Sequence, residues 1–352
     1  MKLLITGNLG YVGPVVARHF RRVFPDACLI GLDSGFFAGC LTELSGFPET
    51  ALDCQYFADV RRVPPEVFND VDAVVHLAAI SNDPMGKAFE SITMEVNHGA
   101  SLAVARQARA AGVKWFVFAS SCSVYGFAEN NARAETSSLN PLTAYARSKV
   151  AAEEGLRALA GPHFCVTCLR FATACGWSPR LRLDLVLNDF VASAIASKRI
   201  DILSDGTPWR PLIDVHDMAR AIEWAATRNR DAGGDYVLVN AGSNRWNCQV
   251  KDLAEAVRQS LPGTGVSLNL NAQPDKRSYR VDFSLFERLA PRHQPKHELA
   301  TSIQELKAGL EAINFADADF RNSRLIRLKT LMALKSSGRL DENLSWASSF
   351  YS

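Results

Sequence analysis

Residues 2–13 read KLLITGNLGYVG, and the order of residue types in this stretch decides the fold. The apolar run Lys2–Thr6 predicts a short buried strand, and the residues after Gly13 continue as a helical segment. Between them, Gly7 permits a tight turn, Gly10 lets backbone amides approach a ligand, and Gly13 lets the helix pack closely. Free N–H groups and the helix dipole favour a pyrophosphate at such a turn, so the stretch predicts a dinucleotide site.

The spacing G-x-x-G-x-x-G differs from the G-x-G-x-x-G of the common dehydrogenase fold, so the next strand matters to the interpretation. That strand, Cys28–Leu32, is followed by Asp33, twenty residues after Gly13. A carboxylate there accepts hydrogen bonds from the adenosine ribose hydroxyls and repels a 2′-phosphate. A plain turn residue is the alternative, but the sequence favours NAD over NADP as the cofactor.

Further strands end in residues suited to the same ligand. Asp59 ends one strand, where its carboxylate would accept a hydrogen bond from the adenine amino group. The buried run Ala73–Ala79 opens into small residues, and a helical segment over 89–112 leads to a strand that delivers Ser120–Ser121. Strands that alternate with helices predict an α/β fold with a parallel, doubly wound Rossmann-type sheet, which binds ligands at the carboxyl ends of its strands.

A candidate catalytic pair lies downstream, where Tyr145 and Lys149 are four residues apart. On a helix this spacing places both on one face, so the Lys149 ammonium lies near the phenol. With an ordinary pKa near ~10, a phenol acts as a base at neutral pH only where positive charge stabilises its phenolate. Lys149 supplies that charge, and Ser121 would hold a substrate oxygen beside Tyr145. The pattern gains its weight from the strand ends that precede it.

Composition limits the classes of protein to which the chain can belong. Its 352 residues, 47% of them hydrophobic, suffice for a large domain plus a smaller one, and a net charge of +2 gives no reason to expect nucleic acid as a partner. Apolar runs are shorter than the ~20 residues of a membrane span, and the start MKLLITG indicates a strand rather than a signal peptide. Eight scattered cysteines show no disulfide framework, which favours a cytoplasmic location.

Two pairs of potential metal ligands have simpler interpretations. Cys165 and Cys168 lie in a continuous apolar run and are expected in the core. His293 and His297 are separated by Pro295, which argues against one helix presenting both to a metal, so a loop pair without a function is expected. The sequence therefore predicts no metal site.

Together, four motifs resemble the extended short-chain dehydrogenase/reductase family, in its nucleotide-sugar epimerase, dehydratase and ketoreductase branch. They are Gly7-x-x-Gly10-x-x-Gly13, His76-Leu-Ala-Ala79, Ser120-Ser-Cys-Ser-Val-Tyr-Gly126 and Tyr145-x-x-x-Lys149. The resemblance covers about residues 1–310. It implies a Rossmann-type domain with a smaller C-terminal α/β substrate domain, a nicotinamide cofactor, a nucleotide-sugar substrate and a homodimer.

The resemblance also implies roles for individual residues. The catalytic set would be Ser121, the acid/base Tyr145, and Lys149, which would position the ribose and lower the pKa of Tyr145. The cofactor set would be Gly7, Gly10, Tyr11, Val12, Gly13, Asp33, Asp59, Val60, Leu77, Ala78, Ala79, Asn97, Ser120, Tyr145, Lys149 and Phe171. The substrate set would be Ser81, Asn82, Ser123, Arg180, Arg182, Asn188, Arg210 and Arg277. Its arginines would hold a diphosphate, although a surface ion pair explains any single one equally well.

These expectations divide the chain into three parts. Residues 1–170 would form the NAD(P)-binding domain that carries Ser-Tyr-Lys, and 171–315 mainly the nucleotide-sugar-binding region, with some segments returning to the Rossmann sheet. Residues 316–352 would form a helical extension. Within it, Phe320–Leu334 mixes apolar and basic residues and predicts an amphipathic helix packed on its own domain, with a membrane or partner surface as the alternative.

The residues after Ser121 bear on the reaction. Dehydratases of the family place an Asp-Glu pair there, whereas Cys122 and Ser123 are not strong acids near neutral pH. We therefore expect a 4-epimerase or a 4-ketoreductase that transfers hydride at a sugar carbinol or keto carbon. A 4,6-dehydratase, a C3/C5 epimerase and a non-catalytic dinucleotide sensor are alternatives. The sequence leaves epimerase and ketoreductase unresolved because both use the same residues.

Overall fold

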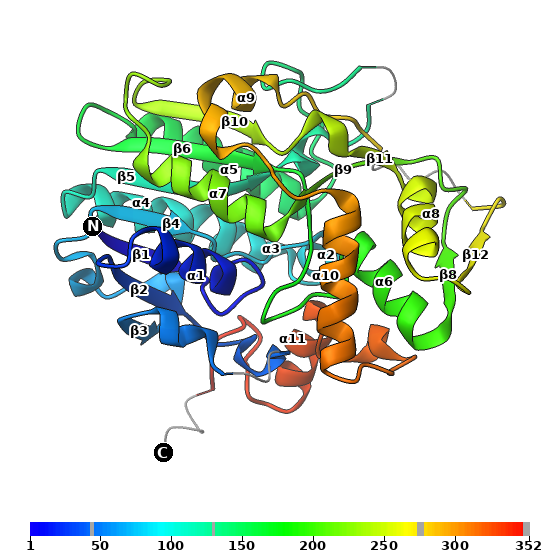
Figure 1. The fold of residues 1–352 in the computed structure, drawn as a ribbon. Coiled ribbons are helices and arrows are strands. Elements are labelled where there is room, and N and C mark those ends of the chain that lie inside the picture. Colours follow the sequence, from blue (N-terminus) through cyan, green and yellow to red (C-terminus); the bar gives the residue numbers. More distant parts are fainter. Residues whose placement is uncertain (43–45, 129–130, 273–277, 348–352) are drawn as a thin grey trace.

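The computed structural model describes residues 1–42, 46–128, 131–272 and 278–347 (Figure 1). Its strands are β1 (Lys2–Thr6), β2 (Cys28–Asp33), β3 (Cys54–Phe57), β4 (Ala73–His76), β5 (Trp115–Ser121), β6 (Cys165–Phe171), β7 (Thr173–Cys175), β8 (Arg199–Ile202), β9 (Trp209–Asp214), β10 (Tyr236–Ala241), β11 (Asn247–Gln249) and β12 (Gly265–Leu268). Its α-helices are α1 (Gly13–Val23), α2 (Asp83–Ala88), α3 (Glu90–Met94), α4 (Ser101–Ala110), α5 (Ala144–Leu159), α6 (Val186–Ser197), α7 (Val215–Thr227), α8 (Val250–Ser260), α9 (Ser284–Leu289), α10 (Leu299–Ala312) and α11 (Arg327–Ser336).

The central sheet has seven strands in the order β10-β6-β5-β4-β1-β2-β3. All its neighbouring strands are parallel, and β1 pairs with β2 on one side and with β4 on the other. The strand order therefore reverses between β1 and β4, which is the switch point where doubly wound sheets bind ligands. The predicted α/β fold with a Rossmann-type sheet is confirmed.

Helices cover both faces of this sheet. Side chains alternate along β1, so Leu3 and Ile5 join the core under α1 and α7, while Leu4 joins the core under α4 and α5. In Figure 1, α1 and α7 lie in front of the sheet, and α4 and α5 lie behind it. Burial on both faces explains why the strands are continuous apolar runs rather than alternating ones.

Two smaller sheets extend the carboxyl edge of the central sheet. One has three strands in the order β11-β9-β7, and the other pairs β8 with β12. Figure 1 shows β8, β12, α6 and α8 grouped on one side of α10, away from the main sheet. Strand β10 instead returns to the central sheet beside β6. Among the described residues, no helix has the length and apolar character needed to cross a bilayer.

The C-terminal segment differs from the sequence expectation. Residues Phe320–Asn322 form one 3-10 turn, and α11 begins at Arg327, so the predicted helix start at Phe320 is wrong. The reason is a competing contact, because the Leu183 N–H donates to the Leu325 carbonyl and Ile326 is extended. After α11 the chain returns to the first half of the molecule, where the Trp346 indole donates to the Ser34 carbonyl at 2.6 Å.

The cysteine and histidine pairs fall in different surroundings. Cys165 and Cys168 are buried and unbridged in β6, as expected. His297 does not share a site with His293: its ring stacks on His216 with centroids 5.1 Å apart. The side chains Asp214, His216, His297 and Glu305 form a group whose potential metal-ligand atoms lie within 4.8 Å of one another. The sequence analysis did not find this group because His216 and His297 are distant in the chain.

Candidate active site

One cavity of about 1070 Å³ lies at the carboxyl ends of β1, β2, β4 and β5. The glycine turn after β1, the residues that follow β4, the start of α5 and the segment 182–190 line it. This edge of an open α/β sheet is where ligands bind, and the volume is at the upper end for small-molecule sites. The cavity therefore has room for a dinucleotide together with a second ligand.

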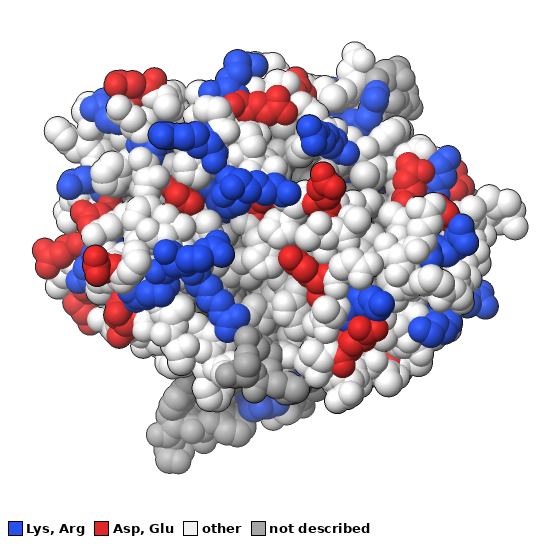
Figure 2. All heavy atoms as spheres, in the orientation of Figure 1, with Lys and Arg blue, Asp and Glu red and all other residues white. Residues whose placement is uncertain are grey.

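Charge outside the cavity is mixed. Figure 2 shows acidic and basic side chains interspersed over one face, with the basic ones most crowded over α1 and α7. Those helices carry Arg18, Arg21, Arg22 and Arg220, and Arg21 is paired with Asp53 at 2.6 Å. This distribution is that of a nearly neutral chain rather than of a polyanion-binding surface.

The glycine turn has the backbone geometry that the sequence predicts. Gly7 has a positive φ of 75°, and a Cβ there would lie 2.6 Å from the backbone N of Ala78. At Gly13 a Cβ would lie 2.4 Å from the Cα of Asn8. A side chain at either position would therefore displace the backbone of the turn or of the loop after β4.

Asp33 holds the same turn from β2. Its carboxylate accepts hydrogen bonds from the Leu9 N–H at 3.0 Å and from the Gly35 N–H at 2.8 Å. Burial raises the pKa of Asp33 in spite of these bonds. Asp59, at the neighbouring strand end, also lines the cavity and forms an ion pair with Arg61.

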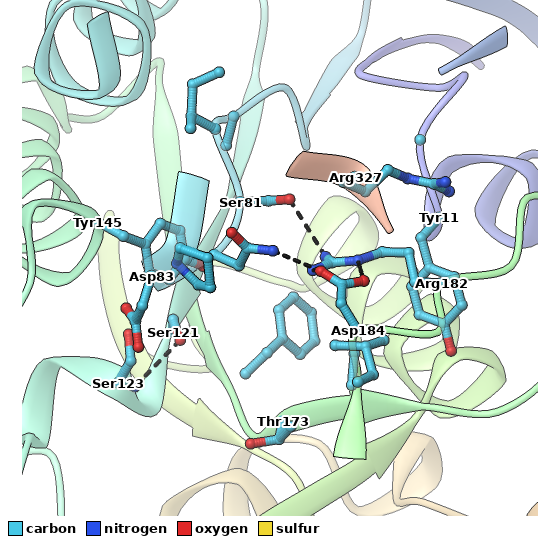
Figure 3. Close-up of a pocket in the computed structure, with 18 of the residues that line it drawn as sticks. Tyr11, Ser81, Asp83, Ser121, Ser123, Tyr145, Thr173, Arg182, Asp184 and Arg327 are labelled. Carbon is cyan, nitrogen blue, oxygen red and sulfur yellow. Dashed lines mark hydrogen bonds and ion pairs between the residues drawn. The ribbon is translucent and has the colours of Figure 1, made fainter. Parts of the chain in front are cut away.

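Strand β5 and helix α5 bring the three candidate catalytic residues to one cavity, and Figure 3 shows Ser121 and Tyr145 there. Ser121 is the last residue of β5, Tyr145 lies in the first turn of α5, and both side chains line the cavity, where the interaction with Ser121 lowers the pKa of Tyr145. Lys149 lies one turn later, where its Nζ donates to the Ala119 carbonyl at 2.7 Å and lies 5.7 Å from the centroid of the Tyr145 ring. Thr143 caps α5 through the Ala146 N–H, which fixes the start of the helix.

The electrostatics of the site act on the phenol in both directions. The pKa of Tyr145 is raised to about 12, chiefly by burial. The interaction with Ser121 lowers this pKa, the charge of Asp83 raises it, and the charge of Arg182 lowers it. Burial also lowers the pKa of Lys149 to about 8, against the opposing charge of Glu153. Full activation of the phenol therefore requires further positive charge in the cavity.

A buried network supports this wall of the cavity from behind. Arg170 donates to Glu153 through Nε at 2.9 Å and through a second nitrogen at 2.6 Å. Ser120 donates to the same carboxylate at 2.5 Å, and the Tyr125 hydroxyl accepts from Arg170 at 3.0 Å. Cys122 also faces this network, since its Sγ donates to the Arg170 carbonyl at 3.1 Å.

The opposite wall comes from the second half of the chain. Arg182 forms an ion pair with Asp184 at 2.7 Å and donates to the Ser81 hydroxyl at 3.3 Å. Asn82 donates to Asp184 at 2.6 Å. In Figure 3, Ser81, Arg182 and Asp184 lie between the Tyr145 side and the Tyr11 side of the cavity, with Arg327 beside Arg182.

Most residues predicted for the site line this cavity. They are Ser121, Tyr145, Lys149, Gly7, Gly10, Tyr11, Val12, Asp33, Asp59, Val60, Leu77, Ala78, Ala79, Ser120, Phe171, Ser81, Asn82, Ser123, Arg182 and Arg210. Arg277 lies outside the described residues.

Four predicted residues instead support the wall from outside. Gly13 packs on Asn8, as described above. Asn97 is fully buried, and its amide bonds both backbone groups of Ile80. Arg180 pairs with Glu49, and the Asn188 amide accepts from the Gly176 N–H at 3.0 Å and donates to the Arg182 carbonyl at 2.9 Å. The side chains of Asn97, Arg180 and Asn188 are each bonded within the protein, which accounts for their place behind the wall.

The structure also adds cavity residues that the sequence analysis missed. They are chiefly Asp83, Thr173, Asp184, Tyr279, Arg327 and Leu344. Asp83 follows the predicted Ser81 and Asn82 directly, and Asp184 lies two residues after Arg182, so proximity to predicted residues was the available signal for both. Arg327 and Leu344 had no such signal, because the segment that carries them is distant in sequence from every motif.

A Rossmann-type sheet with Ser, Tyr and Lys at its ligand edge defines the class of short-chain dehydrogenases/reductases. A family model described as "NAD dependent epimerase/dehydratase family" matches residues 3–242. The chain belongs to this family and is an enzyme of the extended short-chain dehydrogenase/reductase type. Membership confirms the predicted enzyme class and the prediction of NAD as the cofactor.

Individual relatives include both activities named by the family. A UDP-glucose 4-epimerase of Streptomyces lividans is 29% identical over 73% of this chain and 80% of its own length. A dTDP-glucose 4,6-dehydratase of Streptomyces griseus is 28% identical over 68% of this chain and 75% of its own. The structure of a UDP-glucose 4-epimerase from Stenotrophomonas maltophila, with bound NAD and formylated UDP-arabinopyranose, has a TM-score of 0.77 at 22% identity and covers 90% of this chain and all of its own. The last likeness concerns the fold.

Proposed function

We propose that this enzyme is a nucleotide-sugar 4-epimerase that uses Ser121, Tyr145 and Lys149 with NAD. The observation that carries the proposal is that Ser121, Tyr145 and Lys149 line the same cavity as the glycine turn and Asp33. One cavity thus joins a dinucleotide cradle to an acid/base pair.

The described residues fit a bound NAD. The turn at Gly7 leaves no room for a side chain, and Asp33 retains acceptor lone pairs beside the turn that it holds. The reversible acceptance of a hydride from a sugar carbon is the chemistry that bound NAD supplies. A bound nicotinamide would also supply positive charge, which would oppose the effect of burial on the pKa of Tyr145.

The protein's own residues would handle the proton. Ser121 holds the C4 hydroxyl of the sugar, and the Tyr145 phenolate takes the hydroxyl proton as the C4 hydride leaves. Lys149 keeps a positive charge near the ring of Tyr145. After the keto sugar has turned over in the cavity, Tyr145 returns the proton as the hydride returns to the opposite face of C4. Because the proton and the hydride both return to the sugar, the reaction consumes no coenzyme.

The surroundings of Cys122 and Ser123 argue against 4,6-dehydration. Burial raises the pKa of the Cys122 thiol well above its ordinary value, and the thiol points to the Arg170 carbonyl rather than into the cavity. Ser123 does line the cavity, but a hydroxyl is a poor general acid at neutral pH. Neither residue serves as the acid that removal of a sugar hydroxyl requires.

The sugar nucleotide would bind along the wall formed by Ser81, Asn82, Arg182 and Arg210, which lie in the same cavity. Arg182 is paired with Asp184 through Nε and one terminal nitrogen, so it would offer the diphosphate mainly its other terminal nitrogen. A homodimer remains a prediction, for which light scattering during gel filtration is the direct test.

The test is to incubate the purified enzyme with UDP-glucose, UDP-N-acetylglucosamine and UDP-glucuronic acid, and to identify products by NMR. We expect tightly held nicotinamide in the ultraviolet spectrum and a C4 epimer without net NADH consumption. Stoichiometric NADH consumption with a 4-keto sugar would assign a ketoreductase instead, and a 4-keto-6-deoxy product would assign a dehydratase.

Tyr145→Phe should reduce turnover by roughly 10²- to 10⁴-fold, because it removes the group that carries the proton. NAD binding and the circular dichroism spectrum should be unchanged. The matched control is Tyr56→Phe, which alters a tyrosine outside the cavity. Equal turnover by wild type and Tyr145→Phe would remove Tyr145 from the reaction.

A further inference from the structure

Arg327, the first residue of α11, is a buried charge at the cavity for which the described residues provide no ion pair. Its side chain is 1% exposed, lines the cavity and lies over the Phe37 ring, with 5.0 Å between Cζ and the ring centroid. One guanidinium nitrogen donates to the Arg180 carbonyl at 2.7 Å. The other terminal nitrogen has no hydrogen-bond partner among the described residues, and no ion pair of Arg327 occurs there.

The neighbouring carboxylates are already paired with other arginines. Asp184 accepts from two nitrogens of Arg182, at 2.9 and 2.7 Å, and also from Asn82. Glu49 is paired with Arg180. Three guanidinium groups thus share two carboxylates in this corner, and Arg327 is left without one. Burial of an unpaired cation costs several kcal/mol, so the arrangement is that of a binding site for an anion.

The position of Arg327 indicates which anion. The Arg180 carbonyl that holds it belongs to the segment 178–180, and the Ser178 hydroxyl donates to the Tyr11 carbonyl in the glycine turn at 2.6 Å. In Figure 3 the Arg327 guanidinium lies on the Tyr11 side of the cavity, away from Tyr145. A helix start with free N–H groups on one side and a guanidinium on the other suits a pyrophosphate.

The rest of the C-terminal segment closes the same end of the cavity. Arg61, next to the expected adenine position at Asp59, donates to the Asn343 carbonyl at 2.8 Å. Leu344 lines the cavity, and Trp346 packs on Phe36 with ring centroids 5.8 Å apart. Residues 327–346 are therefore tied to both strand ends expected to bind adenosine.

We propose that the segment 327–346 is a wall of the dinucleotide site and that Arg327 binds a phosphate oxygen of the coenzyme pyrophosphate. The proposal rests on the proposed function only in taking the cavity as the NAD site. It also gives a physical reason for a coenzyme that stays bound through turnover, since release would require this anchored segment to move.

The test is a ladder of probes measured by calorimetry on coenzyme-stripped enzyme: adenosine, ADP, NAD, NADP and UDP-glucose. Arg327→Met should weaken ADP and NAD by roughly 10- to 100-fold, the contribution of one charged hydrogen-bonding group, and leave adenosine unchanged. Arg327→Lys should recover part of the loss. The matched control Arg324→Met, at an exposed position three residues earlier, should bind all five probes like wild type.

Three results would overturn the proposal. Unchanged binding of ADP and NAD would make Arg327 structural, loss confined to NADP would assign it to a 2′-phosphate, and loss confined to UDP-glucose would assign it to the substrate. If Arg327→Met does not fold, Arg327→Gln is measured on the same ladder. Epimerase activity is scored separately, so Arg327-dependent ADP binding without epimerisation would reject only the proposed function.

Discussion

Two buried arginines near opposite ends of the cavity are treated differently by the protein. Arg170 lies behind the catalytic wall, by which we mean the side of the cavity that carries Ser121, Tyr145 and Lys149; it is 2% exposed and donates to Glu153 twice and to Tyr125 once. Arg327, on the C-terminal wall, is equally buried but has one carbonyl partner. Burial alone would lower both pKa values. The Glu153 carboxylate outweighs burial and raises the pKa of Arg170, whereas burial lowers the pKa of Arg327 to about 10.

This difference distinguishes an arginine that stabilises the fold from one that is available to a ligand. Satisfied on every side, Arg170 holds β6 against α5 and keeps Ser120 and its neighbour Ser121 in place. Arg327 carries a charge that the described residues do not neutralise, so its free energy depends on a ligand. A buried charge thus indicates a binding role only where no group of the protein neutralises it.

Glu153→Gln would leave Arg170 without a carboxylate partner, as Arg327 is. Of the variants considered, it should reduce the stability of the protein most. Losing the carboxylate leaves a buried cation unpaired, and the free energy of unfolding should fall by about 3–5 kcal/mol. Urea denaturation measures the change as a lower midpoint at unchanged slope. The control is Glu255→Gln, which breaks an exposed pair with Arg258 and should leave the urea midpoint nearly unchanged.

A double variant tests whether the unpaired charge of Arg170 causes the loss of stability. Replacing Glu153 and Arg170 together by methionine removes both charges and should recover most of the lost stability, because the uncompensated charge causes the loss. If the single variant is as stable as wild type, the pair does not support the catalytic wall, and the contrast with Arg327 loses its basis.

The two walls were not equally predictable from the sequence. Gly7, Asp33, Ser121 and the Tyr145–Lys149 pair were identified because each sits in a local pattern of strand, turn or helix whose geometry sequence spacing fixes. The positive φ of Gly7 and the shared cavity agree with those patterns. The parallel, doubly wound sheet was predicted for the same reason, since alternating strands and helices restrict the topology.

The C-terminal wall depends on contacts between distant segments. Spacing shows that Arg180 and Arg182 are cationic, but not that Glu49 takes the first and Asp184 the second. An amphipathic pattern predicted a surface helix, and the structure instead starts α11 at Arg327 and buries that residue. Periodicity describes one helix, whereas the start of α11 is set by the backbone bond of Leu325 to another segment.

Lys149 is a third buried cation and lies between the two extremes. It has one carbonyl partner, and burial lowers its pKa to about 8. Between that value and the unfolded pKa of ~10.4, the unfolded chain binds more protons, so stability contributed by this group rises with pH across that window. Below pH 8 the full cost of burying the charge is present.

Lys149→Met should therefore be more stable than wild type near pH 7, by up to about 3 kcal/mol, and this advantage should disappear by about pH 10.5. Urea midpoints at four pH values without added NAD measure it, with Lys114→Met at an exposed site as the control. An advantage that is constant from pH 7 to 10.5 would mean that Lys149 is not destabilised by burial.

Asp83 and Arg182 both act on the pKa of Tyr145, with opposite signs, and the effect expected from changing either is small. After burial and the interaction with Ser121, Asp83 raises the pKa of Tyr145 and Arg182 lowers it. Asp83→Asn keeps an oxygen that can accept from Thr143 but removes the charge. The pKa of Tyr145 should then fall, which increases the phenolate fraction at any pH below it.

The expected result is a shift of the rising limb of kcat/KM against pH by a few tenths of a unit toward lower pH, in the direction where the sugar is oxidised. Asp26→Asn, which removes an exposed carboxylate outside the cavity, is the control and should leave the limb unchanged. A shift toward higher pH would contradict the sign of the Asp83 contribution. An unchanged limb would mean that the charge of Asp83 is screened from Tyr145.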